Sequence, residues 1–346
     1  MKTFLICLST LLLSISITAQ KNSYKISIVG FYNLENLYDT LNNTEIDDEE
    51  FLPGGPRNYN TIIYNDKLGK LSKVIQEMGK SLTPDGVAIL GVAEIENDTV
   101  LTDLINRPEL RQSHFKFIHY DSPDKRGVDV GLLYNPKYFT VLNSKNLFIQ
   151  LPTGSKESFF TRDVLWVKGI LNGEEIHIYV NHWPSRRGGE ERSAPARAAA
   201  AGVVRHHADS IFKNNAQAKI IIMGDLNDDP INKSLTKVIR AKASKPEVGV
   251  GEFYNPWVQL YKKGIGTLAY QDAWGLFDQI LVSQAFLDKN QKGYFFAQQS
   301  IFNPAYLIEN NGKYKGYPMR TWDGLTYRGG YSDHFPTYIT LLQKIN

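Results

Sequence analysis

The sequence predicts an α/β fold, a sandwich of two mixed β-sheets with helices on the outside, in a single domain that we place at residues 20–346. Two observations predict it. Short runs rich in β-branched residues alternate with segments whose apolar residues recur at helical spacing. These strand-like runs occur in adjacent pairs as well as singly between helices, which favours mixed sheets covered by helices.

The composition is that of an ordinary globular protein. The 346 residues include 39 Lys and Arg against 36 Asp and Glu, a net charge of +3, and 42% are hydrophobic. These values exclude a disordered, collagen-like or coiled-coil chain. The near-neutral charge excludes nucleic-acid binding through a basic tail, although a local basic site is still allowed. The single cysteine excludes a disulfide framework and a cysteine-based zinc site.

The first residues are expected to lie outside the fold. Lys2 is followed by an apolar run from Phe4 to Ile17, and Ala19 then leads into a polar stretch. A positive start, a short apolar segment and small residues at its end are typical of a secretory signal peptide, which we place at residues 1–19. The alternative is an uncleaved membrane anchor, although the run is short for a spanning helix. We therefore expect a secreted or periplasmic protein.

The expected elements follow in chain order. In the first expected strand, Tyr24–Tyr32, Ile26, Ile28 and Phe31 are apolar, with the β-branched Val29 beside them. The run 218–225 is continuously apolar, which is typical of a strand covered on both faces. The remaining expected strands are 86–94, 128–134, 164–170, 176–181, 277–283 and 335–342, and the expected helices are 66–80 and 193–212.

Two stretches interrupt this alternation. Residues 40–60 are acidic and then rich in proline and glycine, and residues 291–331 are rich in aromatic residues, glycine and asparagine. We expect both to be long loops, and loops of this length in a compact domain are usually functional or mobile.

Polar side chains fall at the ends of several predicted strands. A single polar residue at a strand end is commonly a turn residue or a helix cap. Polar residues at the ends of several strands indicate a site, because rigid strands direct these side chains into one crevice. The residues concerned are Asn33, Glu94, Asn181, His182, Asp225, Asn227, Asp278, Asp333 and His334.

This residue set has a chemical meaning. Carboxylates joined by the amide oxygens of Asn33 and Asn227 are hard ligands, which suit Mg²⁺, Mn²⁺ or Ca²⁺ rather than zinc. The imidazoles of His182 and His334 add groups for proton transfer or charge stabilisation. A carboxylate-held metal ion with nearby histidines is what phosphodiester hydrolysis requires.

The motifs that carry these residues resemble those of the endonuclease/exonuclease/phosphatase superfamily, and the resemblance covers residues 26–342. It implies the DNase I-like fold, a four-layer α/β sandwich of two packed mixed sheets flanked by helices. Asp-x-Asn alone is a weak motif, but an upstream strand-end Glu and a C-terminal Ser-Asp-His make the combination specific. The motifs are Asn33-Leu34-Glu35-Asn36, the strand end at Glu94, the segment 126–134, Tyr179-Val180-Asn181-His182, Gly224-Asp225-Leu226-Asn227-Asp228, Phe277-Asp278-Gln279 and Ser332-Asp333-His334.

The resemblance also implies roles for individual residues. Glu94 is the expected principal metal ligand, with Asn33 beside it and Asp333 in support. Asp225 and Asn227 are expected to orient the attacking water and the phosphate, and Asp278 to pair with His334. His182 is expected to contact phosphate or assist the leaving group, and Tyr179 to hydrogen-bond to His182. Members of this superfamily differ in which residue acts as the general base, so we assign that role jointly to Asp225 and His334.

Arginines follow the candidate histidine of the fourth motif. Arg186 and Arg187 suit an anionic substrate, because guanidinium groups pair with phosphate through two hydrogen bonds; the alternative is an exposed helix start paired with Glu190 and Glu191. Arg126 and Asp129 flank a glycine, and an ion pair near the site is one interpretation of them.

The sequence thus predicts an exported, metal-dependent phosphodiesterase, with DNA or RNA as the first substrate class. The alternative is a lipid or small-molecule phosphoesterase, either sphingomyelinase-like or acting on inositol phosphates. Ten aromatic residues between 291 and 331 motivate it, because exposed aromatics such as Phe295 and Phe296 could enter a membrane, stack on bases or form a local core. A binding module without catalysis is disfavoured, because every matched position keeps its residue. No obligate protein partner is indicated, and we expect a monomer.

Overall fold

The computed structural model describes residues 23–152 and 160–345. The expected signal peptide at residues 1–19 lies outside this part of the chain. Among the described residues, no helix is both long and apolar enough to cross a membrane.

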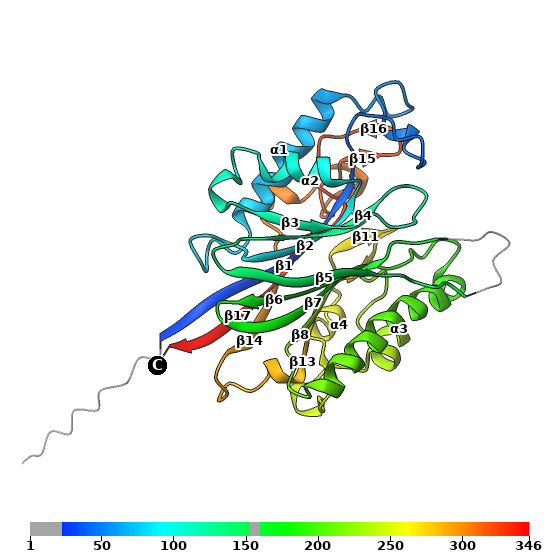
Figure 1. The fold of residues 1–346 in the computed structure, drawn as a ribbon. Coiled ribbons are helices and arrows are strands. Elements are labelled where there is room, and N and C mark those ends of the chain that lie inside the picture. The colour runs from blue at the N-terminus through cyan, green and yellow to red at the C-terminus, as the bar shows by residue number, and fades with distance from the viewer. Residues whose placement is uncertain (1–22, 153–159, 346) are drawn as a thin grey trace, which may run out of the picture.

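Two mixed β-sheets form the centre of the molecule (Figure 1). The first sheet has the strand order β14-β17-β1-β2-β4-β3, and the second has the order β5-β6-β7-β8-β13-β10-β9. The strands of the first sheet are β1 Ser23–Leu37, β2 Ile89–Ile95, β3 Lys116–His119, β4 Asp129–Tyr134, β14 Tyr294–Ile301 and β17 Thr337–Ile345. Those of the second are β5 Phe139–Leu147, β6 Val164–Leu171, β7 Glu174–His182, β8 Ile220–Asp225, β9 Ala241–Lys242, β10 Phe253–Tyr254 and β13 Asp278–Ser283.

The hydrophobic core is divided among three layers. The middle layer lies between the sheets and includes Phe31 of β1, Val180 of β7 and Met223 of β8, all fully buried. A second layer packs α1 (Thr61–Glu77) and α2 (Asp98–Ile105) on the outer face of the first sheet. The third packs α3 (Glu190–Asn214) on the outer face of the second. The predicted α/β sandwich with outer helices is therefore confirmed.

Helix boundaries follow the capping residues. α1 begins about one turn before the predicted 66–80, because the Asn60 side chain accepts hydrogen bonds from the backbone N–H groups of Ile62 and Ile63. α3 is longer at both ends than the predicted 193–212. Pro195 is the sixth residue of this helix, beyond the first turn, so its missing N–H removes one helical hydrogen bond.

Of the two predicted loops, one is irregular and the other contains a β-strand. Residues 40–60 form an irregular segment with one short 3-10 turn, Glu49–Phe51, and Phe51 is buried against Tyr38 and Trp322. The prediction for 291–331 is partly wrong, because it contains β14, which pairs with β17 at the edge of the first sheet. Two small hairpins complete the structure: β11 Leu268–Tyr270 with β12 Ala273–Gly275, and β15 Trp322–Asp323 with β16 Thr326–Tyr327.

Most of the aromatic stretch is local core. Phe295 and Phe296 are only 6% and 3% exposed, and Tyr294 and Trp322 are also buried. These four side chains are therefore not available to insert into a membrane.

Candidate active site

The candidate site lies where strand ends of the two sheets meet. In the second sheet, β7 and β8 are parallel and pair His182 with Asp225, while the antiparallel strand β13 pairs Asp278 with Asp225. Strand register alone therefore places these three side chains in one row. Gly224 sits before Asp225 with φ +153°, and a Cβ there would collide with the carbonyl oxygen of Asn181. The glycine thus permits close approach of β7 and β8 at the site.

The first sheet contributes Asn33 and Glu94. The parallel pairing of β1 with β2 is irregular after Asn33, and Glu94 has φ +60° within this irregularity. Such local distortions re-aim side chains next to active sites. The backbone N–H of Asn36 donates to Glu94 Oε2 at 2.9 Å, which fixes the carboxylate.

One amide joins the two sheets at the site. Asn33 Nδ2 lies 3.2 Å from Glu94 Oε1 and 3.1 Å from Asp225 Oδ2. Asn33 and Asp225 are buried, whereas the Glu94 side chain is 16% exposed. Two carboxylates from opposite sheets therefore face one another, with one of them open to solvent.

His182 lies beside both carboxylates. Its Nε2 atom is 3.6 Å from Asp225 Oδ2 and 3.8 Å from Glu94 Oε1. Burial, with the nearby guanidinium groups of Arg162 and Arg126, lowers the pKa of His182 well below its ordinary value. His182 is therefore a neutral imidazole at physiological pH.

Asp278 and His334 form a buried pair. His334 Nδ1 lies 2.7 Å from Asp278 Oδ2, which also accepts a hydrogen bond from the Thr267 hydroxyl at 2.5 Å. Burial opposes the charged imidazole, but the Asp278 carboxylate and its hydrogen bond prevail and hold the pKa of His334 well above its ordinary value. His334 Nε2 points toward Asp225, with Oδ2 at 3.9 Å.

Asp225 is at the centre of the cluster. Burial raises its pKa to about 7, with Asp278 adding to the shift and His334 opposing it. The backbone N–H of Asn227 donates to Asp225 Oδ1 at 3.0 Å, and the Asn227 side chain donates to the carbonyl of Trp183. A carboxyl group that titrates near neutral pH is suited to proton transfer.

The C-terminal motif is tied to the first strand. The Ser332 hydroxyl donates to the carbonyl of Asn33 at 2.7 Å and accepts from the backbone N–H of His334 at 3.1 Å. The Asp333 side chain is 34% exposed, with Oδ1 3.9 Å from His334 Nε2. The predicted residues Asn33, Glu94, His182, Asp225, Asn227, Asp278, Asp333 and His334 are thus linked to one another by these contacts.

The donor atoms suit a hard divalent cation. Glu94 and Asp225 present carboxylate oxygens to the same amide. Asp225, Asp278 and His334 also lie within 4.8 Å of one another, but a protonated His334 has no lone pair to offer a cation. Two carboxylates at close range repel one another unless a cation lies between them. Oxygen donors of this kind match Mg²⁺ or Mn²⁺.

Tyr179 is not part of this cluster. Its hydroxyl lies 2.8 Å from His207 Nδ1 on the α3 side of the second sheet, so the expected hydrogen bond to His182 is wrong. The reason is the two-residue period of a strand: Tyr179 and His182 are three positions apart, so their side chains point to opposite faces.

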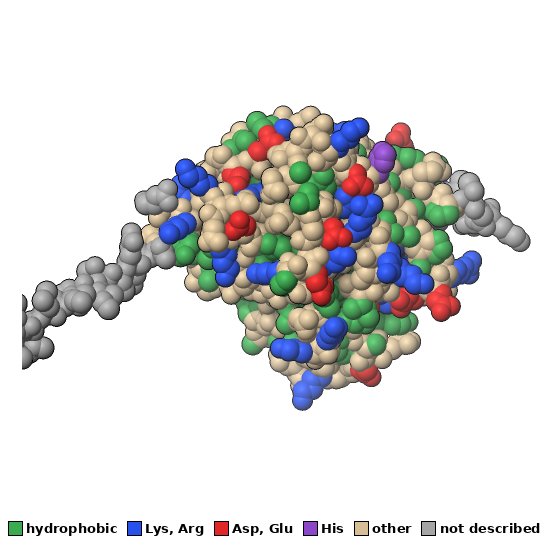
Figure 2. Space-filling view, turned by 90° about the horizontal axis from the view of Figure 1, so that it is seen from below, with side chains coloured by type: hydrophobic (Ala, Val, Ile, Leu, Met, Phe, Trp, Pro, Cys, Tyr) green, Lys and Arg blue, Asp and Glu red, His purple; other side chains and the backbone are tan. Residues whose placement is uncertain are grey.

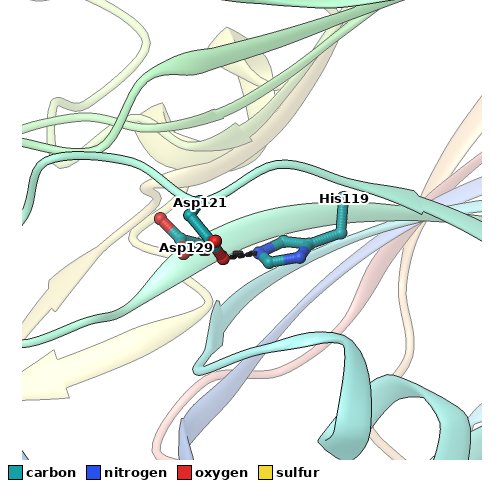
Figure 3. Close-up of side chains that lie close together, drawn as sticks. All are labelled: His119, Asp121 and Asp129. Atoms are coloured by element: carbon teal, nitrogen blue, oxygen red, sulfur yellow. Dashed lines mark hydrogen bonds and ion pairs between the residues drawn. The ribbon is translucent and has the colours of Figure 1, made fainter. Parts of the chain in front are cut away.

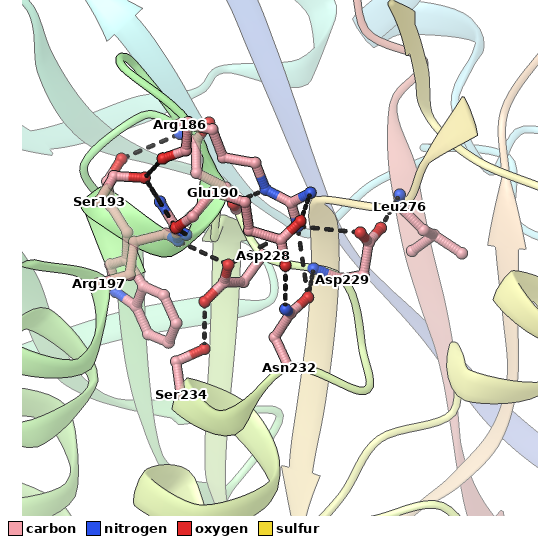
Figure 4. Close-up of polar contacts among 12 residues, drawn as sticks. Arg186, Glu190, Ser193, Arg197, Asp228, Asp229, Asn232, Ser234 and Leu276 are labelled. Carbon is pink, nitrogen blue, oxygen red and sulfur yellow. Dashed lines mark hydrogen bonds and ion pairs between the residues drawn. The ribbon is translucent and has the colours of Figure 1, made fainter. Parts of the chain in front are cut away.

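Arg186 is held by acidic groups (Figure 4). Its Nη1 atom lies 2.9 Å from Glu190 Oε2, its Nη2 atom lies 2.9 Å from Asp229 Oδ2, and its Nε donates to the carbonyl of Asn227. The guanidinium also lies 4.5 Å from the centre of the Phe277 ring. Arg186 therefore braces the loop after β8, whereas Arg187 is exposed.

A second group of acidic and histidine side chains lies on β3 and β4 (Figure 3). His119 Nδ1 is 2.8 Å from Asp98 Oδ1, and its Nε2 is 3.3 Å from Asp129 Oδ2. Asp129 is thus bound to His119 rather than to Arg126, and the ion pair considered for Arg126 and Asp129 is wrong. Both ring nitrogens of His119 are occupied, so the group acts as a clamp between α2 and β4.

Sequence reasoning missed Arg162 and Asp124. Arg162 is buried and donates from Nε and Nη2 to the carbonyls of His182 and Trp183, at 3.1 and 2.7 Å. Its Nη1 atom lies 3.1 Å from Asp124 Oδ2. Thr161-Arg162-Asp163, three polar residues just before an apolar strand, is the only sequence signal that could have pointed to this position.

Comparisons with known proteins agree with this architecture. The model of the endonuclease/exonuclease/phosphatase family matches residues 28–343. No curated protein matches the sequence. A Bacteroides thetaiotaomicron protein of the same family is similar in structure, with 14% identity, TM-score 0.57, and coverage of 94% of this chain and 100% of that one.

Two further solved structures share the fold. The mannosyl-6-phosphatase of Bacteroides thetaiotaomicron is 15% identical with TM-score 0.56, and 91% of this chain and 99% of that one are covered. D. rerio TDP2 complexed with a single-strand DNA product is 15% identical with TM-score 0.53, at 91% and 98% coverage. The extent of the family match, together with the fold, shows that this chain is a member of the endonuclease/exonuclease/phosphatase family.

Proposed function

We propose that this protein hydrolyses phosphoester bonds with the help of a divalent metal ion. The observation that carries the proposal is the convergence of Glu94, Asp225 and His182 with the Asp278–His334 pair at one meeting point of the two sheets. We propose Glu94 as principal ligand, with Asn33 beside it and Asp333 in support. A bound Mg²⁺ or Mn²⁺ would neutralise charge on the phosphate oxygens.

The protonation states of Asp225, His334 and His182 suit each residue to a different step of the reaction. Asp225, whose pKa is about 7, is ionised in a large fraction of molecules at neutral pH and can accept a proton from water. His334 is a cation held by Asp278 and can stabilise negative charge on the phosphate. Of the two residues that share the expected role of general base, we therefore propose Asp225. Neutral His182 can donate a hydrogen bond to a phosphate oxygen, and Asn227 orients Asp225.

The first proposed substrate class is nucleic acid, cleaved at phosphodiester bonds. Support comes from the family and from the fold shared with TDP2, whose structure contains a single-strand DNA product. Figure 2 shows Lys and Arg interspersed with Asp and Glu on the face it presents, rather than one continuous basic field. Binding would therefore depend on local contacts at the site more than on long-range attraction.

The second proposed class is a small phosphoester. The fold is shared with a mannosyl-6-phosphatase at a similar TM-score. The paired acidic partners of Arg186 also reduce its capacity to bind a polyanionic chain. A lipid substrate loses its main motivation, because Phe295 and Phe296 are buried.

A panel of phosphoester substrates distinguishes the proposed substrate classes. Purified protein is incubated with plasmid DNA, RNA, sphingomyelin, inositol phosphates and mannose 6-phosphate, each with Mg²⁺ or with EDTA. Cleavage of DNA or RNA supports the nuclease assignment, and release of phosphate from a sugar or inositol phosphate alone supports the small-substrate assignment. Asp225→Asn serves as the inactive control for contaminating enzymes.

Export is proposed separately from the activity. Residues 1–19 have the pattern of a signal peptide, so the mature protein is proposed to begin near residue 20 and to act outside the cytoplasm. N-terminal sequencing of protein recovered from the native host tests this. A mature chain that still begins at Met1 would contradict it.

A further inference from the structure

The loop before β4 holds an arginine at the edge of the candidate site. Arg126 donates from Nε and Nη2 to the two carboxylate oxygens of Asp124, each at 3.2 Å. The backbone N–H of Arg126 donates to the same carboxylate at 3.0 Å. Half of the Arg126 side chain is exposed, whereas that of Asp124 is 5% exposed. The guanidinium is therefore held in one orientation with one side open to solvent.

Asp124 connects this arginine to the candidate site. It also pairs with the buried Arg162, which donates to the carbonyls of His182 and Trp183. The chain of contacts from Arg126 through Asp124 and Arg162 thus ends on the backbone of His182. Asp124 and Arg162 are buried, and every link of this chain is a charged hydrogen bond, so the guanidinium of half-exposed Arg126 is held relative to that histidine.

The other end of the loop is tied to the first sheet. The Tyr38 hydroxyl, one residue beyond β1, donates to the carbonyl oxygen of Arg126 at 2.6 Å. Burial opposes the charge on Arg126, but Asp124 and then Glu94 raise its pKa, and Arg126 in turn lowers the pKa of His182. The Arg126 guanidinium therefore lies within electrostatic range of Glu94 and His182.

Arg126 and Arg186 differ in the donors they leave available. Each of the three guanidinium nitrogens of Arg186 has an acceptor. Nη1 of Arg126 has no hydrogen-bond acceptor among residues 23–152 and 160–345. The Asp124 carboxylate binds both Arg126 and Arg162, so its single negative charge does not neutralise both guanidinium groups. A guanidinium that is held by Asp124, linked through Arg162 to the backbone of His182, and left with a free N–H group is suited to bind a phosphate oxygen.

We infer that Arg126 binds the substrate phosphate and favours a dianionic phosphate over a monoanionic one, with Asp124 and Arg162 as the residues that position it. This inference rests on the proposed function and assigns a substrate-binding residue to the same site. Preference for the dianion follows from charge, because a further positive group at the site would stabilise the additional negative charge of a phosphomonoester.

The test compares Arg126→Gln and Arg126→Lys with wild type. Binding of inorganic phosphate in the presence of Mg²⁺ is measured by calorimetry. Hydrolysis of p-nitrophenyl phosphate and of bis(p-nitrophenyl) phosphate is measured alongside. Arg111→Gln, at an exposed arginine in the turn before β3, is the matched control. Thermal unfolding of each variant checks the fold, and Asp124 keeps Arg162 as a partner in both Arg126 variants.

We expect Arg126→Gln to weaken phosphate binding by about 10- to 100-fold, the usual effect of losing a charged hydrogen bond. Its kcat/KM should fall more for the monoester than for the diester, and Arg126→Lys should restore part of the loss because charge remains without the guanidinium fork. Arg111→Gln should match wild type.

Two results would overturn the inference: unchanged phosphate affinity in Arg126→Gln, or an equal fall of kcat/KM for both substrates in that variant. A wild-type protein that hydrolyses no phosphoester would instead refute the proposed function. The calorimetric measurement keeps the two failures distinct, because it does not require turnover.

Discussion

His334 Nδ1 and Asp278 Oδ2 lie 2.7 Å apart in a buried pair that spans two sheets and 56 positions of sequence. The Thr267 hydroxyl donates to the same carboxylate oxygen, and the Thr267 carbonyl accepts from the backbone N–H of Phe335. The pair is therefore held from both sides. It fixes which nitrogen of His334 faces Asp225, and it keeps the imidazole charged.

Asp278→Asn should remove the charge that holds this imidazolium. With Asp278 neutral, burial dominates and the pKa of His334 falls, so its cationic form is lost at a lower pH than in wild type. We expect activity at neutral pH to fall by about 10²- to 10⁴-fold. The pH dependence of kcat measures this, and an alkaline limb that stays in place would contradict the role of Asp278.

Asp225→Asn should abolish proton transfer while leaving the fold intact, because an amide occupies the same volume. The hydrogen bond from the Asn227 N–H to the side-chain oxygen can be kept. Loss of about 10²- to 10⁴-fold in kcat is expected for a general base. Single-turnover kinetics checks it; a variant with normal kcat and a raised KM would show that Asp225 only binds substrate.

Glu94→Gln should weaken metal binding more than it alters the fold. The Asn36 N–H can still donate to the remaining carbonyl oxygen, whereas the charge facing Asp225 is lost. We expect Mg²⁺ affinity to fall by about 10- to 100-fold or more, since even residues outside the ligand set have effects of that size. Calorimetric titration with Mg²⁺ measures it, with Glu175→Gln on the far part of β7 as the control.

Glu35→Ala should destabilise the protein. Glu35 is buried and accepts from the backbone N–H groups of Thr321 and Trp322, and its own carbonyl accepts from Lys67 Nζ at 2.7 Å. Removing the carboxylate leaves the buried backbone N–H groups of Thr321 and Trp322 without their acceptor, which costs about 1–3 kcal/mol of unfolding free energy for each group. Urea unfolding measures the loss, and Glu35→Gln, which keeps one acceptor, should lose less.

His177 should make the protein less stable in mild acid. Burial lowers its pKa to about 4 in the folded state, and it stacks on Trp166. In the unfolded chain its pKa is near 6.5, so between pH 6.5 and 4 the unfolded state binds a proton that the folded state does not. Stability contributed by neutral His177 is therefore present above pH 6.5 and is lost as pH falls toward 4.

The measurement is the unfolding free energy from pH 7 to pH 4 in wild type and in His177→Phe. Each unit of pKa difference corresponds to about 1.4 kcal/mol. The variant should lose less stability over this range, because it carries no group to protonate. Parallel curves for the two proteins would show that His177 is not the cause.

The sequence predicted most of the fold because its buried strands have a simple pattern. β8 is continuously apolar and ends in Asp225, and both features were visible without a structure. β14 was missed because its aromatic residues lie in a glycine- and asparagine-rich stretch and because its partner β17 follows about forty residues later. Pairing at that separation leaves no local signal.

The residues of the candidate site that lie at strand ends could be predicted from the sequence. His182, Asp225 and Asp278 follow from register, but the contacts of the arginines do not. Glu190, four positions after Arg186, was one of its expected partners, but nothing in the sequence indicated that Asp229, in the loop after β8, would also bind it. Arg162 was overlooked because its hydrogen bonds go to backbone carbonyls, which have no signature in sequence.

The most direct test of the central claim is the initial rate of phosphoester hydrolysis by wild type and by Asp225→Asn, with Mg²⁺ and with EDTA, on the substrate that the panel identifies. We predict that wild type is active with Mg²⁺, inactive in EDTA and restored by added Mg²⁺, and that Asp225→Asn is inactive under all conditions. Wild-type hydrolysis that persists in EDTA, or an Asp225→Asn variant as active as wild type, would contradict the account.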